Sequence, residues 1–336
     1  MSYQREKQVA IQAVTAAAQL CEQVRQEEGS LTLTKPDRSP VTVADFGTQA
    51  VICRVLAEAF PRDSIVGEEN SSLLRQPAMT QQLTGVTHYV KNQIAEATPE
   101  TIITWIDRGT GQVADRYWTL DPIDGTKGYV RGDNYAIALA LIEDGEVKLG
   151  VLGCPAIPIH PNQPDGDRGV LFVGVKEQGT TLIPLAGGQP QTIRVNECDR
   201  IESLRLVKSV ESSHGNPELQ AAITQSLGFI TPSLQIDSMV KYGIIARGEA
   251  DLYIRLPFPL ESSKRQNIWD HAAGVVVLEE AGGRVTDMYG KPLDFACGTK
   301  LFNNQGIIAS NGAIHDVVLA AVAQEIQASE TSKFIP

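Results

Sequence analysis

The sequence predicts a layered α/β fold, in which layers of helices alternate with layers of β-sheet. Helical and strand-like segments alternate along the chain. Two apolar segments, residues 135–142 and 147–152, flank a short acidic turn with a glycine, which predicts a β-hairpin. Two other strand-like segments, residues 64–67 and 117–120, lead directly into acidic residues. Strand ends of this kind are a usual place for a functional site in α/β folds.

The composition limits the classes of function. The chain has 336 residues, enough for one large or two ordinary domains, and 42% hydrophobic with 21% charged residues is typical of a soluble globular protein. The net charge of −11 argues against non-specific binding to nucleic acid or to anionic membranes, and no apolar run is long enough to span a membrane. A pocket that holds metal can still attract an anionic small molecule.

The cysteines and the N-terminus predict a cytoplasmic protein. Five cysteines are scattered along the chain without CxxC spacing, so we expect reduced thiols and no disulfide framework. The first residues show the mixed charge of a helix and neither a signal nor a transit pattern. We also expect a monomer or a weak homo-oligomer.

The first part of the chain reads mainly as helices. Apolar residues recur at helical spacing over residues 3–28, and a second helix begins between Thr42 and Asp45 and ends before Pro61. The polar, proline-containing loop at 34–42 is either a mobile lid or a plain connector. One or two helices are expected within residues 72–98, followed by a strand at 102–106.

A change in composition predicts a domain boundary. Four prolines fall between residues 154 and 169, so we expect an N-terminal domain over 1–158 and a C-terminal domain over 159–336. In the second domain the expected strands are 170–176, 192–196, 204–209, 251–257, 284–287 and 307–310, and the expected helices are 217–227, one from 236, 268–280 and 313–326.

The chemistry centres on the string Asp-Pro-Ile-Asp-Gly-Thr-Lys-Gly at residues 121–128. Pro122 disfavours a central-strand position, and Gly125 permits a tight turn. Asp121 and Asp124 can converge on one point, where they would repel each other unless a hard cation such as Mg²⁺ bound between them. The alternative is a simple strand-to-helix turn in which Asp124 or Thr126 only caps the next helix.

Five acidic residues lie at the ends of expected elements, namely Asp45, Glu68, Asp121, Asp124 and Asp270. No array of histidines or cysteines accompanies them, which favours Mg²⁺ or Mn²⁺ over Zn²⁺. Two or more Mg²⁺ ions held between carboxylates form a device for phosphoryl transfer. Alternatively, Asp45 is only the partner of Thr42 in a capping box, and the Glu68-Glu69 pair is only a solvated turn.

Three motifs resemble those of the lithium-sensitive, Mg²⁺-dependent phosphatases related to inositol monophosphatase. They are Gly67-Glu68-Glu69, the string at 121–126, and Trp-Asp-His-Ala-Ala-Gly at 269–274, and their order and spacing agree over nearly the whole chain. The resemblance implies the sandwich of helix and sheet layers shared by inositol monophosphatases and fructose bisphosphatases. Residues 127–129, the segment 236–242 and Arg255 further resemble the 3'(2'),5'-bisphosphate nucleotidases, although Met239-Val240 departs from the Gln-Ala of that branch.

The resemblance also implies roles for individual residues. Two or three Mg²⁺ ions, with Mn²⁺ as an alternative, would be held by Glu68, Asp121, Asp124, Asp270 and the carbonyl of Ile123. Asp45 and Thr126 would orient and deprotonate the attacking water. The substrate would contact Thr126, His214, Ser238, Lys241, Arg255 and Asp270. Without the resemblance, Lys241 and Arg255 read as ordinary surface charges and His214 as a loop residue facing water.

The implied activity is hydrolysis of the 3'-phosphate of adenosine 3',5'-bisphosphate to AMP and phosphate, with 3'-phosphoadenylyl sulfate as a further substrate. An inositol mono- or polyphosphate phosphatase, or a fructose bisphosphatase, is the close alternative, since fold does not fix substrate. A non-catalytic nucleotide sensor is disfavoured because all five acids and Thr126 are present. A haloacid-dehalogenase-type phosphatase is disfavoured because its two aspartates are spaced by two residues, whereas Asp121 and Asp124 are spaced by three.

Overall fold

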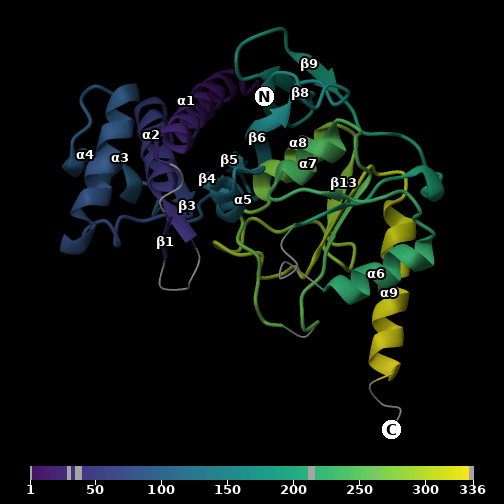
Figure 1. Ribbon diagram of the computed structural model, residues 1–336. Helices are drawn as coiled ribbons and strands as arrows, with labels where there is room; N and C mark the ends of the chain where they lie inside the picture. Colours follow the sequence, from purple (N-terminus) through teal and green to yellow (C-terminus); the bar gives the residue numbers. More distant parts are fainter. Residues whose placement is uncertain (1, 29–31, 35–39, 211–215, 261, 333–336) are drawn as a thin grey trace.

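A seven-stranded mixed sheet forms the centre of the molecule (Figure 1). The computed structural model describes residues 2–28, 32–34, 40–210, 216–260 and 262–332. In spatial order the strands are β3 (Ser64–Gly67), β4 (Arg116–Asp124), β5 (Ala136–Glu143), β6 (Glu146–Pro158), β7 (Arg168–Val175), β8 (Gly179–Pro184) and β9 (Gln191–Ile193). Only β3 and β4 pair in parallel, and the other neighbours in this sheet are antiparallel.

Helices cover both faces of this sheet, which confirms the predicted layered α/β fold (Figure 1). On one face lie α1 (Gln4–Glu28) and α2 (Val43–Ala59), with α3 (Thr80–Gln93) and α4 (Pro99–Asp107) packed outside them. On the other face lie α7 (Val240–Ala246) and α8 (Ala272–Glu280). In the part of the chain that the structure describes, no helix combines the length and apolar character needed to cross a membrane.

The alternation of side chains along β5 explains why both faces are covered. Ile137, Leu139 and Leu141 point into the core beneath α1 and α2. The intervening Ala138 and Ala140 point into the second core, beneath α7 and α8. Because successive side chains of a strand face opposite ways, a strand that is apolar throughout is buried on both sides.

Small residues on the second face allow α8 to lie very close to the sheet. A Cβ atom at Gly150 of β6 would lie 2.7 Å from the carbonyl oxygen of Ala273. A Cβ atom at Gly174 of β7 would lie 2.8 Å from the carbonyl oxygen of Val276. Both distances are shorter than real Cβ contacts, so this approach of α8 depends on glycine at the two positions.

The predicted hairpin is confirmed, whereas the strand predicted at residues 102–106 is wrong. Asp144 and Gly145 connect β5 to β6 with positive φ angles of 52° and 76°, as in a tight hairpin turn. Residues 102–106 belong instead to α4, which begins at Pro99 after the capping residue Thr98. The periodicity of a short apolar run does not distinguish a strand from a buried helix. Here the N-terminal cap at Thr98 favours the helix.

The remaining elements form a smaller unit beside the main sheet. A second sheet has the order β12 (Leu252–Arg255), β14 (Ile307–Ser310) and β13 (Arg284–Thr286), and it packs with α6 (Pro217–Leu227) and α9 (His315–Ser332).

The short elements of the chain are β1 (Thr32–Thr34), β2 (Pro40–Thr42), α5 (Thr126–Arg131), β10 (Val207–Lys208), β11 (Leu234–Gln235) and the 3₁₀ turns Pro77–Met79 and Ile201–Ser203. Within the predicted strands 192–196 and 204–209, only 192–193 and 207–208 belong to the strands of the structure, and β8 was not predicted.

Two predictions concern positions rather than elements. The domain boundary expected after residue 158 falls between β6 and β7, which are paired neighbours in the main sheet, and the division into two domains stays a prediction. Most of the loop at 34–42, residues 35–39, lies outside the described residues, so its role as a lid also stays a prediction.

Candidate active site

The aspartates of the central motif lie on β4 itself, not after it as the sequence suggested. The ladder between β4 and β5 is regular as far as Asp121, opposite Ala138, and resumes at Asp124, opposite Ala136, so that Pro122 and Ile123 form a bulge. Proline lacks the amide hydrogen that a regular ladder needs, and a bulge tolerates it. The bulge re-aims the end of the strand and brings Asp121 and Asp124 to the wall of one cavity.

Glu68 joins these aspartates because β3 runs parallel to β4. Gly67 lies opposite Leu120, and the amide nitrogen of Glu68 donates to the carbonyl oxygen of Leu120 at 3.0 Å. Glu68 therefore leaves β3 directly beside Asp121 and lines the same cavity. The fourth carboxylate, Asp270, comes from the turn immediately before α8.

The four carboxylates are brought together in a site that is largely shielded from water, and this changes their pKa values. Burial raises the pKa of Asp121 well above its usual range, and the charges of Glu68, Asp124 and Asp270 raise it further. Burial also raises the pKa of Asp124 to about 6, although Lys241 and the Met239 amide oppose this shift. The pKa of Asp270 is raised to about 7, again mainly by burial, with Arg255 acting in the opposite direction. A bound cation would reverse these shifts, because it stabilises the ionised carboxylates.

The donor set fits a hard divalent cation. Asp121 Oδ1 is buried and has no hydrogen-bond partner in the described part of the chain, and such a carboxylate oxygen is a ready ligand for Mg²⁺ or Mn²⁺. Among the described residues, no three histidine, cysteine or acidic side chains already converge closely enough to hold a metal ion. The four carboxylates instead line the wall of a cavity of about 450 Å³. The carbonyl oxygen of Ile123, which accepts from Thr126 Oγ1 at 3.1 Å, lies at the same wall.

The two carboxylate oxygens of Asp45 have different partners. Oδ2 accepts from the amide and the hydroxyl of Thr42, both at 2.7 Å, which confirms the capping box predicted at the start of α2. Oδ1 accepts from the hydroxyl of Thr126 at 3.4 Å. The structural and catalytic interpretations of Asp45 are therefore compatible, because the cap leaves one oxygen for Thr126.

Two cationic side chains, Lys241 and Arg255, line the same cavity, and we call them its cationic wall. Lys241 is buried, and burial lowers its pKa to about 8 although Asp124 opposes the shift. Burial also disfavours the charge of Arg255, but Tyr253, Asp270 and Asp124 outweigh it and raise the pKa of Arg255. Lys241 is therefore not the exposed surface charge of the alternative interpretation. Ser238 also lines the cavity, and its φ of 69° falls in the left-handed region, which residues other than glycine rarely adopt.

The structure adds residues that the sequence did not single out. Lys264, Asn267, Tyr253 and His271 also line the cavity. His271 is buried, with Nδ1 2.8 Å from the Tyr242 hydroxyl, and it also lines the cavity. Lys264 and Asn267 lie in a polar stretch without periodicity, so no local pattern reveals them. His214 lies outside the described residues.

The fold and this acidic cavity define a metal-dependent phosphatase of known type: the chain belongs to the inositol monophosphatase family, whose model matches residues 2–328. Membership of this family implies the use of a divalent metal. A 3'(2'),5'-bisphosphate nucleotidase from Emericella nidulans is 39% identical over 97% of this chain and 100% of its own length. A second 3'(2'),5'-bisphosphate nucleotidase, from Schizosaccharomyces pombe, is 40% identical over 96% of both chains.

The solved structures agree with the fold. An IMPase from Thermotoga maritima superimposes with a TM-score of 0.64, at 23% identity, over 95% of this chain and 97% of its own. At this level of identity the similarity shows a common fold and does not extend to the substrate.

Proposed function

We propose that this protein hydrolyses the 3'-phosphate of adenosine 3',5'-bisphosphate to AMP and phosphate, and that it also accepts 3'-phosphoadenylyl sulfate. The observation that carries this proposal is the placement of Lys241 and Arg255 on the same cavity as the four carboxylates. A substrate with a second phosphate uses both walls at once, whereas a simple monophosphate does not. The names of the two nucleotidase relatives support the same substrate.

The acidic wall would hold the metal. Two or three Mg²⁺ ions, replaceable by Mn²⁺, are assigned to Glu68, Asp121, Asp124, Asp270 and the carbonyl of Ile123. When bound, such ions lower the pKa of water and neutralise charge on the reacting phosphate. Asp121 and Asp124 lie on β4, Glu68 follows its paired neighbour β3, and Asp270 lies in the turn before α8, so the sheet fixes the relative positions of the first three.

Thr126 and Asp45 would move the proton of the attacking water. The single proton of the Thr126 hydroxyl lies within reach of both the Ile123 carbonyl oxygen, at 3.1 Å, and Asp45 Oδ1, at 3.4 Å. When the hydroxyl donates to Asp45, its lone pairs are available to accept a hydrogen bond from water. As the water attacks phosphorus, its proton passes to Thr126 Oγ1 while the hydroxyl proton of Thr126 passes to Asp45. Ser238, Lys241 and Arg255 would hold the second phosphate and the sugar, and His214 is assigned to the nucleotide through the family resemblance alone.

Two other functions make different demands on the site. The substrate of an inositol monophosphatase would need the acidic wall but would have no second phosphate for Lys241 and Arg255. A nucleotide sensor without turnover would need the cationic wall but not the pair formed by Asp45 and Thr126. The arrangement on a single cavity favours the nucleotidase over both.

The test is phosphate release with Mg²⁺ present from adenosine 3',5'-bisphosphate and from inositol 1-phosphate in parallel, each with and without lithium. Fast release from the nucleotide alone, inhibited by lithium and abolished in Asp121→Asn, is the expected result. Preference for inositol 1-phosphate would overturn the nucleotide assignment and leave the metal chemistry intact. Tight nucleotide binding without turnover would favour the sensor.

A further inference from the structure

The segment that follows β3 is held by a buried side chain of α2, that of Gln49. Its Oε1 accepts from the backbone amide of Glu69 at 3.0 Å, and its Nε2 donates to the carbonyl oxygens of Glu69 and Ile106, the latter at 3.1 Å. Gln49 is fully buried. A single amide group therefore pairs both backbone polar groups of Glu69, much as a neighbouring strand would.

Two glycines enclose this amide group. A Cβ atom at Gly67 would lie 2.7 Å from Gln49 Oε1, and one at Gly109 would lie 2.6 Å from Nε2. Gly67 and Gly109 also pair with each other, through an amide-to-carbonyl hydrogen bond of 2.7 Å. The space beside the end of β3 is thus filled by Gln49 in one orientation.

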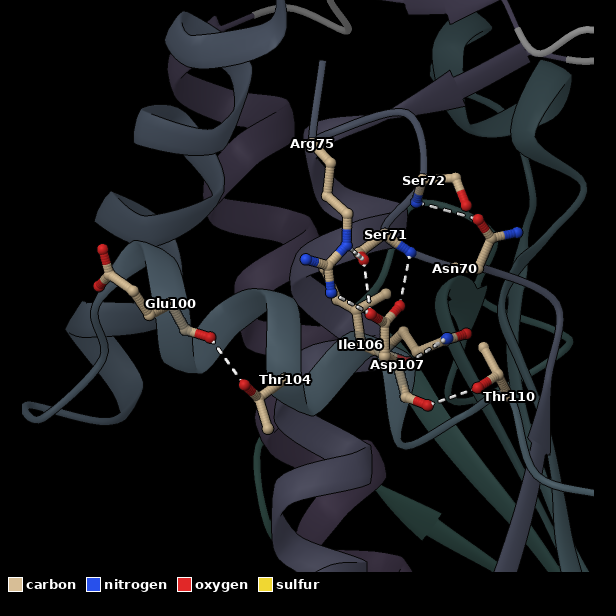
Figure 2. A network of polar contacts seen from close by, with 10 residues as sticks. Asn70, Ser71, Ser72, Arg75, Glu100, Thr104, Ile106, Asp107 and Thr110 are labelled. Carbon is tan, nitrogen blue, oxygen red and sulfur yellow. Dashed lines mark hydrogen bonds and ion pairs between the residues drawn. The ribbon is translucent and has the colours of Figure 1, made fainter. Parts of the chain in front are cut away.

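Asp107, the last residue of α4, fixes the same segment further along (Figure 2). Its Oδ1 accepts from the Ser71 amide at 2.9 Å, and its Oδ2 accepts from the Ser71 hydroxyl at 2.7 Å and from Arg75 at 2.6 Å. On the other side, the amide of Glu68 is tied to β4 through Leu120. Glu68 is therefore bracketed by anchored backbone before and after it.

Gln49 also shares a helix face with Asp45. The two residues are four positions apart on α2, so their side chains leave the helix in nearly the same direction. Asp45 reaches Thr126, and Gln49 reaches the backbone beside Glu68. The helix α2 therefore positions both the Asp45–Thr126 pair and the end of β3, where the assigned metal ligand Glu68 lies.

We propose that Gln49 is a positioning residue that sets the affinity of the acidic cavity for divalent metal by fixing the backbone beside Glu68. This inference rests on the proposed function, in which Glu68 ligates the metal. Loss of a group that orients a metal ligand without touching the metal commonly changes the metal affinity by about 10- to 100-fold. A residue that only contributed to folding would change stability and leave that affinity alone.

The experiment compares Gln49→Met with Thr48→Val in the full-length protein. Methionine keeps the length and apolar packing of Gln49 but has none of its three hydrogen bonds. Thr48 is the adjacent, equally buried residue of α2, and its hydroxyl contacts Cys21 Sγ at 3.1 Å, away from the cavity. Mn²⁺ binding to the substrate-free proteins is measured by calorimetry, and the Mg²⁺ midpoint and the plateau of phosphate release are measured alongside.

The expected result for Gln49→Met is a rise in the Mn²⁺ dissociation constant of about 10-fold or more, with most of the plateau rate recovered at saturating Mg²⁺. Thr48→Val should lower the melting temperature without changing metal affinity. Equal metal affinities in the two variants would overturn the inference. If Gln49→Met does not fold, Gly109→Ala displaces the same amide, and it should weaken metal binding in the same direction.

Glu68→Gln separates the inference from the function on which it rests. If Glu68→Gln loses metal affinity and Gln49→Met does not, the inference alone is wrong. If Glu68→Gln binds metal as the wild type does, then the assigned metal site is wrong, and the role of Gln49 falls with it.

Discussion

The carboxylate of Asp124 accepts a hydrogen bond from the backbone amide of Met239 at 2.5 Å, across 115 positions of sequence. Asp124 ends β4, and Met239 directly precedes α7, next to Ser238. The acidic wall of the cavity and the wall assigned to the substrate are therefore joined through one carboxylate oxygen. The Asp124 carboxylate supplies both a negative charge and a hydrogen-bond acceptor. One substitution can remove the charge alone, and another can remove both.

Asp124→Asn and Asp124→Ala are expected to differ in stability when metal is removed with EDTA. Asparagine can still accept from the Met239 amide, whereas alanine leaves that buried amide unpaired, at a cost of about 1–3 kcal/mol. Urea unfolding should therefore show Asp124→Ala as the less stable variant by this amount. Equal stabilities would mean that the link to Met239 contributes nothing. Both variants should lose phosphate release.

Thr126→Val should lower kcat by about 10²- to 10⁴-fold, the usual contribution of a positioned proton acceptor. Valine has nearly the same shape but no hydroxyl to pass a proton to Asp45. The Mg²⁺ midpoint should change little, because the assigned metal ligands are other residues. Steady-state kinetics at saturating Mg²⁺ provide the measurement, and a variant with wild-type kcat and only a raised KM would exclude the proposed proton transfer.

Lys241→Met should reduce kcat/KM for adenosine 3',5'-bisphosphate by about 10- to 100-fold, the loss expected for hydrogen bonds to a charged group. Adenosine 3'-monophosphate lacks the second phosphate and should lose far less. The matched control is Lys148→Met, since Lys148 pairs with Glu146 on the hairpin and does not line the cavity. A similar loss on both substrates would place Lys241 at the reacting phosphate instead.

Gly174→Ala should destabilise the protein by about 1–3 kcal/mol, because the added methyl group collides with the backbone of α8. Gly179→Ala is the control: its Cβ atom would meet nothing closer than 3.8 Å, and its φ of 79° should cost about 1 kcal/mol. Chemical denaturation measures both. A smaller effect at Gly174 than at Gly179 would show that α8 can move away from the sheet at little cost.

Stability should fall as the pH falls from about 6.5 to about 4, in part because of His315. Burial, aided by Arg284, lowers the pKa of His315 from 6.5 to about 4. In this window the unfolded chain binds a proton that the folded protein does not, so acid favours unfolding. His315→Gln removes this contribution, and the stability difference between the wild type and the variant should shrink with falling pH. A difference independent of pH would show that His315 titrates normally in the folded state.

The sequence predicts those parts of the site whose residues lie close together along the chain. One motif contains Asp121, Asp124 and Thr126, and the strand-like segment at 64–67 identified Glu68 as a further candidate. The parallel pairing that brings Glu68 beside Asp121 is seen only in the structure. The capping box at Thr42 and Asp45 was also readable, since it depends on spacing alone.

The rest depends on geometry that local patterns do not encode. The positive φ of Ser238 shortens the helix expected from residue 236, so that α7 begins only at Val240. The strand expected at 102–106 became α4 because Thr98 caps a run of apolar residues that suits either structure. Gln49 gave no signal, because its partners are backbone groups far away in the chain.

The closeness of α8 to the sheet has a consequence for how this family can diversify. Asp270 lies in the turn just before α8. Its position in the cavity therefore depends on Gly150 and Gly174, which allow α8 to approach the sheet and do not themselves line the cavity. A larger side chain at either position is therefore expected to displace Asp270, which we assign to the metal. New substrate preferences are therefore expected mainly from cavity residues outside the helices that pack on the sheet, such as Lys264.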